Sequence, residues 1–425
     1  MKKIFLIALL LSTPLYAQLA WRIISTPMPY PVYGGQVVYD LASQSSKVYI
    51  LGGYSELLQR EVDWIQEYDV AALENPWRIV GNMLQIRKNF VADVWKNSIM
   101  FYGGIVDASS DKYTMEGWNF KTASQPPIVF DRNANFGRAL STGHIVGDKL
   151  YVIGGDSLNV SGSSAFPYIV EYNLTTKQTE FTIPFPSASN KPRQHMTFII
   201  ADNIYIFGGV FNGVKRTIKK FNIPQRSFSD LTEKLNEARA GGAAVYNPIS
   251  RKGFIIGGYN ETNSALSSVE EVVVGTNNAL SITQSTPLNY ARTNLMAVNY
   301  QGTVIVLGGK DASGKVVPFV EISENKTDVG YDGKIYTEFQ LQQNYPNPFN
   351  PETVISYQIA SAGYVSLKIY NSLGQEVATI VNEYQLPGVY NKMFSAEGKQ
   401  LPSGVYYYSL RSGNYSSTKK MILIK

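Results

Sequence analysis

The chain has 425 residues, a length that favours more than one domain. Hydrophobic residues make up 44% of it and charged residues 17%, so it can bury a sizeable core and is not disordered by composition. The net charge of +5 is scattered, without the basic stripe that nucleic acid requires, and the lack of cysteine excludes disulfides and thiol chemistry.

The first 17 residues have the features of a secretory signal peptide. Lys2 and Lys3 form a positive start, and an apolar stretch over 4–11 follows them. Pro14 then interrupts the stretch, and Ala17 is a small residue suited to cleavage. A buried N-terminal helix is the alternative, but the charges and the break lie where export needs them. No later run reaches the ~18 apolar residues that span a bilayer, so we expect an exported, soluble protein without a transmembrane segment.

An apolar, strand-like run that ends in two glycines recurs six times in the middle of the chain. The pairs are Gly52-Gly53, Gly103-Gly104, Gly154-Gly155, Gly208-Gly209, Gly257-Gly258 and Gly308-Gly309. Their first glycines are spaced by 49 to 54 residues. Two glycines at the end of a strand allow a sharp turn or the close approach of another backbone.

Each copy carries further elements. An arginine stands about sixteen residues before the glycine pair in five copies, and the first copy has Val32 at the matching place. These arginines are Arg87, Arg138, Arg193, Arg239 and Arg292. An alternating stretch after each arginine predicts a strand, another strand follows the glycines, and a fourth is clearest around Trp77. Four short strands per ~50-residue unit form one blade of a β-propeller.

The period, the paired glycines, the upstream arginine and the downstream aromatic residue together resemble the kelch repeat over residues 19–325. The resemblance, to propellers of the galactose-oxidase central-domain type, implies an all-β fold with a six-bladed kelch-type β-propeller over 18–325. Kelch-type oxidases hold copper with two histidines and a cysteine-modified tyrosine. That cofactor cannot form without cysteine, so we expect no cofactor.

The last copy has no clear fourth strand of its own. Near the N-terminus, the stretch AWRII matches PWRIV of the first copy and places Trp21 where that copy has Trp77. We therefore expect the first strand of the mature chain to complete the last blade. Such a closure leaves no long free edge.

The rest of the chain divides into a linker over 326–340 and a small β-sandwich over 341–425. A proline-rich stretch opens this domain, with Tyr345 and Phe349 available to anchor it. Alternating strands are then expected over 353–359, 364–371, 389–395, 404–410 and 418–425. Turns are expected at 372–374, 387–388 and 403–404.

The pattern NYPNPFNPETVISYQI, VSLKIYNSLGQEVATIV, LPSGVYYYSL and KKMILIK is similar to the C-terminal sorting domain of type IX secretion substrates. The motif residues are Tyr345, Pro346, Asn347, Pro348, Phe349, Asn350, Pro351, Gly374, Gly404, Lys419 and Lys420. The segment 390–400 departs from the family by lacking the usual Trp-Asp. The resemblance implies Sec export, passage across the outer membrane through the type IX machinery, and removal of the domain by a surface sortase. The propeller is then the cargo, anchored at the cell surface or released.

Candidate site residues in the propeller are few. His144 and His195 fall at different positions of their repeats, so we expect ordinary strand residues and no metal site. The five arginines are the candidate ligand-binding residues, because the kelch resemblance places them near one channel mouth, where they would attract a carboxylate. The alternative is that each one bonds loop carbonyls or a carboxylate of a neighbouring blade.

Two functions remain open. The first is a non-catalytic module that binds a glycan or a protein at or beyond the cell surface. The alternative is a carbohydrate-active enzyme on the same ring, such as a sialic-acid mutarotase-like epimerase. That enzyme needs an acid or base beside the arginines, and the sequence nominates none, so we favour the binding module.

Overall fold

The computed structural model divides into two compact units, residues 1–326 and 327–425. The described residues are 19–424 except 41–44, 73–74, 107–113, 123–124, 133, 135, 157–165, 187–191, 276–278, 326–337, 361–362, 386–387, 400 and 413–414. The expected signal peptide and most of the expected linker lie outside these residues. The described residues contain strands and one short 3₁₀ helix, η1 (Phe120–Thr122).

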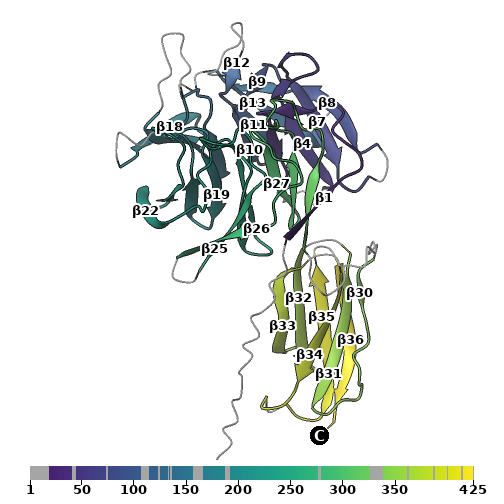
Figure 1. Ribbon diagram of the computed structural model, residues 1–425. Helices are drawn as coiled ribbons and strands as arrows, with labels where there is room; N and C mark the ends of the chain where they lie inside the picture. Colours follow the sequence, from purple (N-terminus) through teal and green to yellow (C-terminus); the bar gives the residue numbers. More distant parts are fainter. Residues whose placement is uncertain are drawn as a thin grey trace, which may run out of the picture. The chain divides into compact units, whose positions relative to one another are not determined.

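The first unit is a ring of six four-stranded antiparallel sheets, the blades (Figure 1). The first strands of the blades contact one another around the ring and line its channel. They are β3 (Gln36–Val38), β10 (Val91–Trp95), β15 (Thr142–Val146), β19 (Met196–Ile200), β23 (Ala243–Asn247) and β27 (Met296–Tyr300). We number the blades 1 to 6 in this order.

The other strands of each blade follow outward from the channel. The second strands are β4 (Lys47–Leu51), β11 (Ser98–Tyr102), β16 (Lys149–Ile153), β20 (Asn203–Phe207), β24 (Lys252–Ile256) and β28 (Thr303–Leu307). The third strands are β7 (Trp64–Asp69), β13 (Met115–Asn119), β17 (Tyr168–Asn173), β21 (Thr217–Asn222), β25 (Val269–Val274) and β29 (Glu321–Asn325). The outermost strands are β8 (Trp77–Asn82), β14 (Ile128–Asp131), β18 (Gln178–Pro184), β22 (Ser227–Lys234), β26 (Leu280–Ser285) and β1 (Leu19–Ile23).

Short strands supplement blades 1 and 2. They are β2 (Val32–Tyr33), β5 (Tyr54–Ser55), β6 (Arg60–Glu61), β9 (Arg87–Lys88) and β12 (Ile105–Val106). The apolar cores lie between adjacent blades. One joins Val48 and Ile50 of blade 1 to Ile305 and Leu307 of blade 6, so the first and last repeats pack together.

The paired glycines join neighbouring blades. Both glycines of every pair have positive φ, a conformation that other residues rarely adopt. A Cβ on Gly52 would lie 2.6 Å from the carbonyl oxygen of Arg87. The N–H of Gly53 donates to that same carbonyl at 2.9 Å. The glycines are therefore required because the backbone of the next blade passes directly over them.

The expected ring closure is confirmed. Strand β1 pairs antiparallel with β29 and forms the outer edge of blade 6. Trp21 lies opposite Ser323, and Trp77 lies opposite Tyr68 at the corresponding place in blade 1. The indole N–H of Trp21 also donates to the carbonyl of Thr286 at 2.9 Å, which ties the closing strand to blade 5.

The second unit is a β-sandwich of two antiparallel sheets around one apolar core. The first sheet contains β30 (Gln340–Leu341), β31 (Glu352–Ile359) and β34 (Gly388–Ser395). The second contains β33 (Glu376–Gln385), β32 (Gly363–Asn371), β35 (Gly404–Ser412) and β36 (Tyr415–Leu423). The strands β30 and β33 were not among those expected from the sequence.

The proline-rich entry segment is anchored by one of its two aromatic residues. Phe349 is 1% exposed and packs in the sandwich core. Tyr345 is 81% exposed, so the expectation that its side chain also anchors the segment was wrong. Its backbone N–H and carbonyl both bond Val354 instead, so the residue is held through its main chain.

Candidate functional site

Four of the five candidate arginines lie inside the blades, 0–1% exposed, rather than at an open channel mouth. Each donates from Nη1 to the carbonyl of the first glycine in its own blade's pair, at 2.8–3.1 Å. Three of them also pair with fully buried glutamates: Arg87 with Glu116 (2.5 Å), Arg239 with Glu270 (2.8 Å) and Arg292 with Glu321 (2.7 Å). The alternative of a structural role fits these contacts, and we do not propose Arg87, Arg138, Arg239 or Arg292 as ligand contacts at the mouth.

Each buried glutamate also holds the loop that enters its blade. The second carboxylate oxygen accepts a backbone N–H from that loop, from Leu84, Asn236 and Asn289 in the three blades. Breaking such a pair would leave an uncompensated charge inside the protein, which costs about 3–5 kcal/mol.

Arg193 does not occupy the place of the other four. In blade 3 the N–H of Gly155 donates to the carbonyl of Pro192, as that of Gly104 donates to Arg138. Arg193 is therefore one residue past the repeat position, which Pro192 occupies. Its side chain is 36% exposed, and its Nη1 lies 2.7 Å from Oδ2 of the buried Asp156. The five arginines thus do not form one ring.

A closed circle of backbone hydrogen bonds surrounds the channel instead. Six residues have φ between 51° and 66°. Each lies two positions before the first residue of its blade's inner strand. Each donates its N–H to the carbonyl of the preceding member at 2.6–3.0 Å. The members of this backbone ring are Gly34, Asn89, Leu140, Gln194, Gly241 and Asn294. The ring links all six blades without using a side chain.

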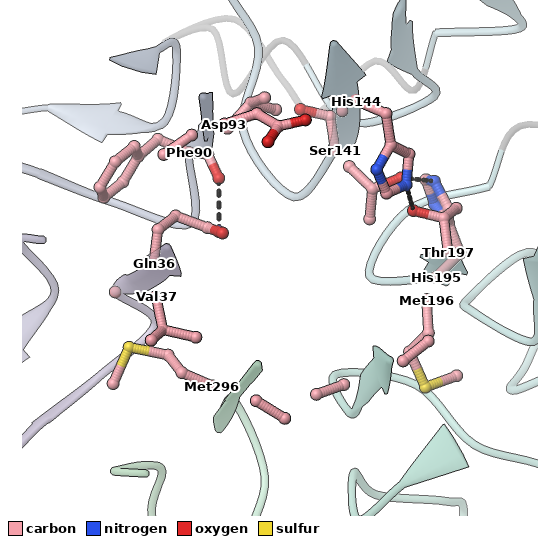
Figure 2. A pocket seen from close by; sticks show the side chains of 18 of the residues that line it. Gln36, Val37, Phe90, Asp93, Ser141, His144, His195, Met196, Thr197 and Met296 are labelled. Atoms are coloured by element: carbon pink, nitrogen blue, oxygen red, sulfur yellow. Dashed lines mark hydrogen bonds between the residues drawn. The ribbon is translucent and has the colours of Figure 1, made fainter. Parts of the chain in front are cut away.

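A pocket of about 260 Å³ lies in the channel next to the backbone ring, lined by residues from all six blades (Figure 2). Its walls differ in chemistry. Blade 1 contributes Gln36, and blades 2 to 4 contribute the polar side chains Asp93, Ser141, Thr142, His144, His195 and Thr197. Blades 5 and 6 contribute only glycine, alanine, leucine and methionine. Figure 2 shows His144, His195, Thr197 and Met196 gathered on one side of the pocket and Gln36, Val37 and Met296 on the other.

The two histidines are held by threonines in a crossed arrangement. Nε2 of His144 lies 2.7 Å from Oγ1 of Thr197, and Nε2 of His195 lies 2.8 Å from Oγ1 of Thr142. The histidines were expected to be ordinary strand residues, and this link between blades 3 and 4 was not predicted. The signal was present in the repeats as Thr-Gly-His over 142–144 and His-Met-Thr over 195–197.

Burial shifts the titration of the pocket's ionisable groups. It lowers the pKa of His144 to about 4, and burial together with the nearby His144 lowers the pKa of His195 to about 3. Both imidazoles are neutral at pH 7. Burial raises the pKa of Asp93 to about 6, although its carboxylate accepts the N–H groups of Val94 and Ile145, each at 2.7 Å.

Within the described part of the chain, no three His, Cys, Asp or Glu side chains are grouped so as to hold a metal ion. Among the same residues, no helix has the length and apolar character needed to cross a membrane.

Residues 343–425 match the family described as "Secretion system C-terminal sorting domain". The C-terminal unit is a type IX secretion sorting domain. It implies that the chain interacts with the type IX machinery and is secreted to the cell surface or beyond.

The propeller also has a counterpart among solved structures. The structure titled "Structure of YjhT" matches 70% of this chain and 96% of its own chain, with a TM-score of 0.55 and 15% sequence identity. At that identity the likeness concerns the fold, and the first unit is a kelch-type β-propeller. No curated protein matches the sequence.

Proposed function

We propose that the chain is an exported binding module whose propeller takes a polar, sugar-sized ligand in the channel pocket. The observation that carries the proposal is the division of the pocket into a polar wall from blades 2 to 4 and an apolar wall from blades 5 and 6. A sugar ring has the same division, with hydroxyl groups at its edge and C–H groups on its faces. Ligand sites typically combine an apolar lining with a few placed polar groups.

The volume and charge of the pocket narrow the ligand class. At about 260 Å³ the pocket is smaller than the roughly 300–1,000 Å³ of drug-sized ligand sites, which suits one sugar ring. The hydroxyl groups of Thr142 and Thr197 and the neutral imidazoles provide donors and acceptors on one wall. Asp93 is the one acidic side chain among the lining residues, which favours a neutral sugar over an acidic one.

A glycan array followed by calorimetry with the full chain tests the proposal. Ala297 lines the apolar wall, so Ala297→Phe adds a ring on that wall and leaves the polar side chains themselves unchanged. We expect this variant to lose binding while the wild-type chain binds a monosaccharide or a terminal sugar. Ser229→Phe adds the same ring to the exposed strand β22 and should leave binding intact. Binding that survives Ala297→Phe would move the ligand to the outer loops and contradict the proposal.

Asp93 favours an enzyme as the second candidate function. A carboxyl group whose pKa is raised to about 6 in a cavity has the properties of a general acid or base. If the pocket interconverts sugar anomers, Asp93→Asn should abolish the exchange of anomeric NMR signals at unchanged affinity. Equal exchange with and without protein would leave the binding module as the function.

A further inference from the structure

Arg138 in blade 3 is a buried cation without a paired carboxylate. Its side chain is 1% exposed, like those of the three arginines that pair with glutamates. Among the described residues, no Asp or Glu forms an ion pair with it. An isolated charge inside a protein is costly unless an opposite charge accompanies it.

The contacts of Arg138 supply only partial negative charge. Nε donates to the carbonyl of Phe136 at 3.1 Å, and Nη1 donates to that of Gly154 at 2.8 Å. The guanidinium carbon lies 4.4 Å from the ring centre of Phe166 and 4.9 Å from that of Tyr168. Nη2 is buried and has no hydrogen-bond partner in the part of the chain that the structure describes.

The register of the blades shows which residue replaces the glutamate. Glu116, Glu270 and Glu321 each pair with the strand residue two before their blade's first glycine, namely Phe101, Ile255 and Val306. In blade 3 that residue is Val152, and it pairs with Val170. Val170 ends in two methyl groups and brings no charge toward Arg138.

The pKa of Arg138 is consistent with the absence of a nearby glutamate. Burial lowers its pKa to about 10, and only the Tyr168 and Tyr102 hydroxyls oppose the shift. For Arg292, at the same position of blade 6, the opposing contribution comes chiefly from Glu321. At this position the described residues of blade 3 therefore lack the carboxylate that blades 2, 5 and 6 contain.

We propose that blade 3 binds a small monovalent anion, chloride or a similar halide, beside Nη2 of Arg138. The ion takes the role that a glutamate carboxylate has in three other blades. A guanidinium N–H that lacks a protein partner is a charge-assisted donor suited to an anion. A buried water could satisfy this donor, but it would not neutralise the charge.

Thermal unfolding of the full chain in chloride and in gluconate at equal ionic strength tests the site. All five tryptophans lie in the first unit, so their fluorescence follows the propeller. At chloride concentrations above the dissociation constant, a tenfold increase in chloride should raise the folding equilibrium constant tenfold. This adds about 1.4 kcal/mol to the free energy of unfolding and raises Tm by roughly 2–4 °C. Bromide should reproduce the effect and give an anomalous peak beside Arg138 in a crystal.

Two variants and a control separate this site from general ion effects. Val170→Glu supplies the missing carboxylate, so its Tm should no longer depend on chloride. Arg138→Gln removes the cation and should lose the dependence as well, whereas the partly exposed Arg193→Gln should retain it. A wild-type Tm that is equal in chloride and gluconate, or a crystal without bromide at Arg138, would overturn the proposal. A chloride effect that survives Arg138→Gln would do the same.

Discussion

The closing strand β1 provides a direct test of how the ring is held together, and Trp21 is its largest contact. The side chain is 9% exposed and packs with Phe254 of blade 5 and Val304 of blade 6. Trp21→Ala removes this packing, which costs about 3–5 kcal/mol for a buried tryptophan. It also leaves the Thr286 carbonyl without its indole donor, which adds about 1 kcal/mol. The sum is a large share of the 5–15 kcal/mol that stabilises a typical domain.

Trp77→Ala is the matched control, because Trp77 occupies the same place on the outer strand of blade 1. Trp77 is only half-buried, and its indole N–H has no partner among the described residues. It packs against Tyr68 with ring centres 4.6 Å apart. We therefore expect its loss to cost less, about 2–3 kcal/mol.

Urea unfolding of the full chain, followed by the fluorescence of the remaining tryptophans, measures both costs. Trp21→Phe separates the two contributions, since it retains much of the packing and loses the hydrogen bond to Thr286. Equal midpoints for Trp21→Ala and Trp77→Ala would refute the reasoning, because they would mean that ring closure does not depend on this contact.

Three further outcomes are expected. Leu140 is the bulky member of the backbone ring at φ 57°, so Leu140→Asn should relieve strain and raise stability by about 0.5–1 kcal/mol in a melting experiment; a lower Tm would contradict this. Folding lowers the pKa of His144 and His195, so the unfolded chain binds protons that the folded chain cannot. In urea unfolding the histidines should lower stability from pH 6.5 toward pH 4, by up to about 2–3 kcal/mol each; Asp93, whose pKa folding raises to about 6, partly offsets this, and substitution of the histidines by glutamine should remove the fall. Phe349→Ala should destabilise the sandwich by about 3–5 kcal/mol, whereas the exposed Tyr345→Ala should change its melting by less than about 0.5 kcal/mol.

The sequence by itself determined the architecture of both units. The six glycine pairs could be found without a structure because positive φ and a close backbone contact leave glycine as the one suitable residue. The closing strand was visible because Trp21 and Trp77 fill the same place in two blades. The sorting domain was recognisable because its motifs stand close together along the chain.

Only the tertiary structure decided which residues meet in the channel. Arg193 was grouped with the other arginines, but Pro192 occupies the repeat position, as its carbonyl bond to Gly155 shows, and Arg193 is partly exposed. The crossed contacts of His144 with Thr197 and of Thr142 with His195 join two blades, so they depend on how neighbouring sheets pack. Local sequence dictates the shape of a blade because its turns are local, whereas the pocket exists only where six inner strands converge.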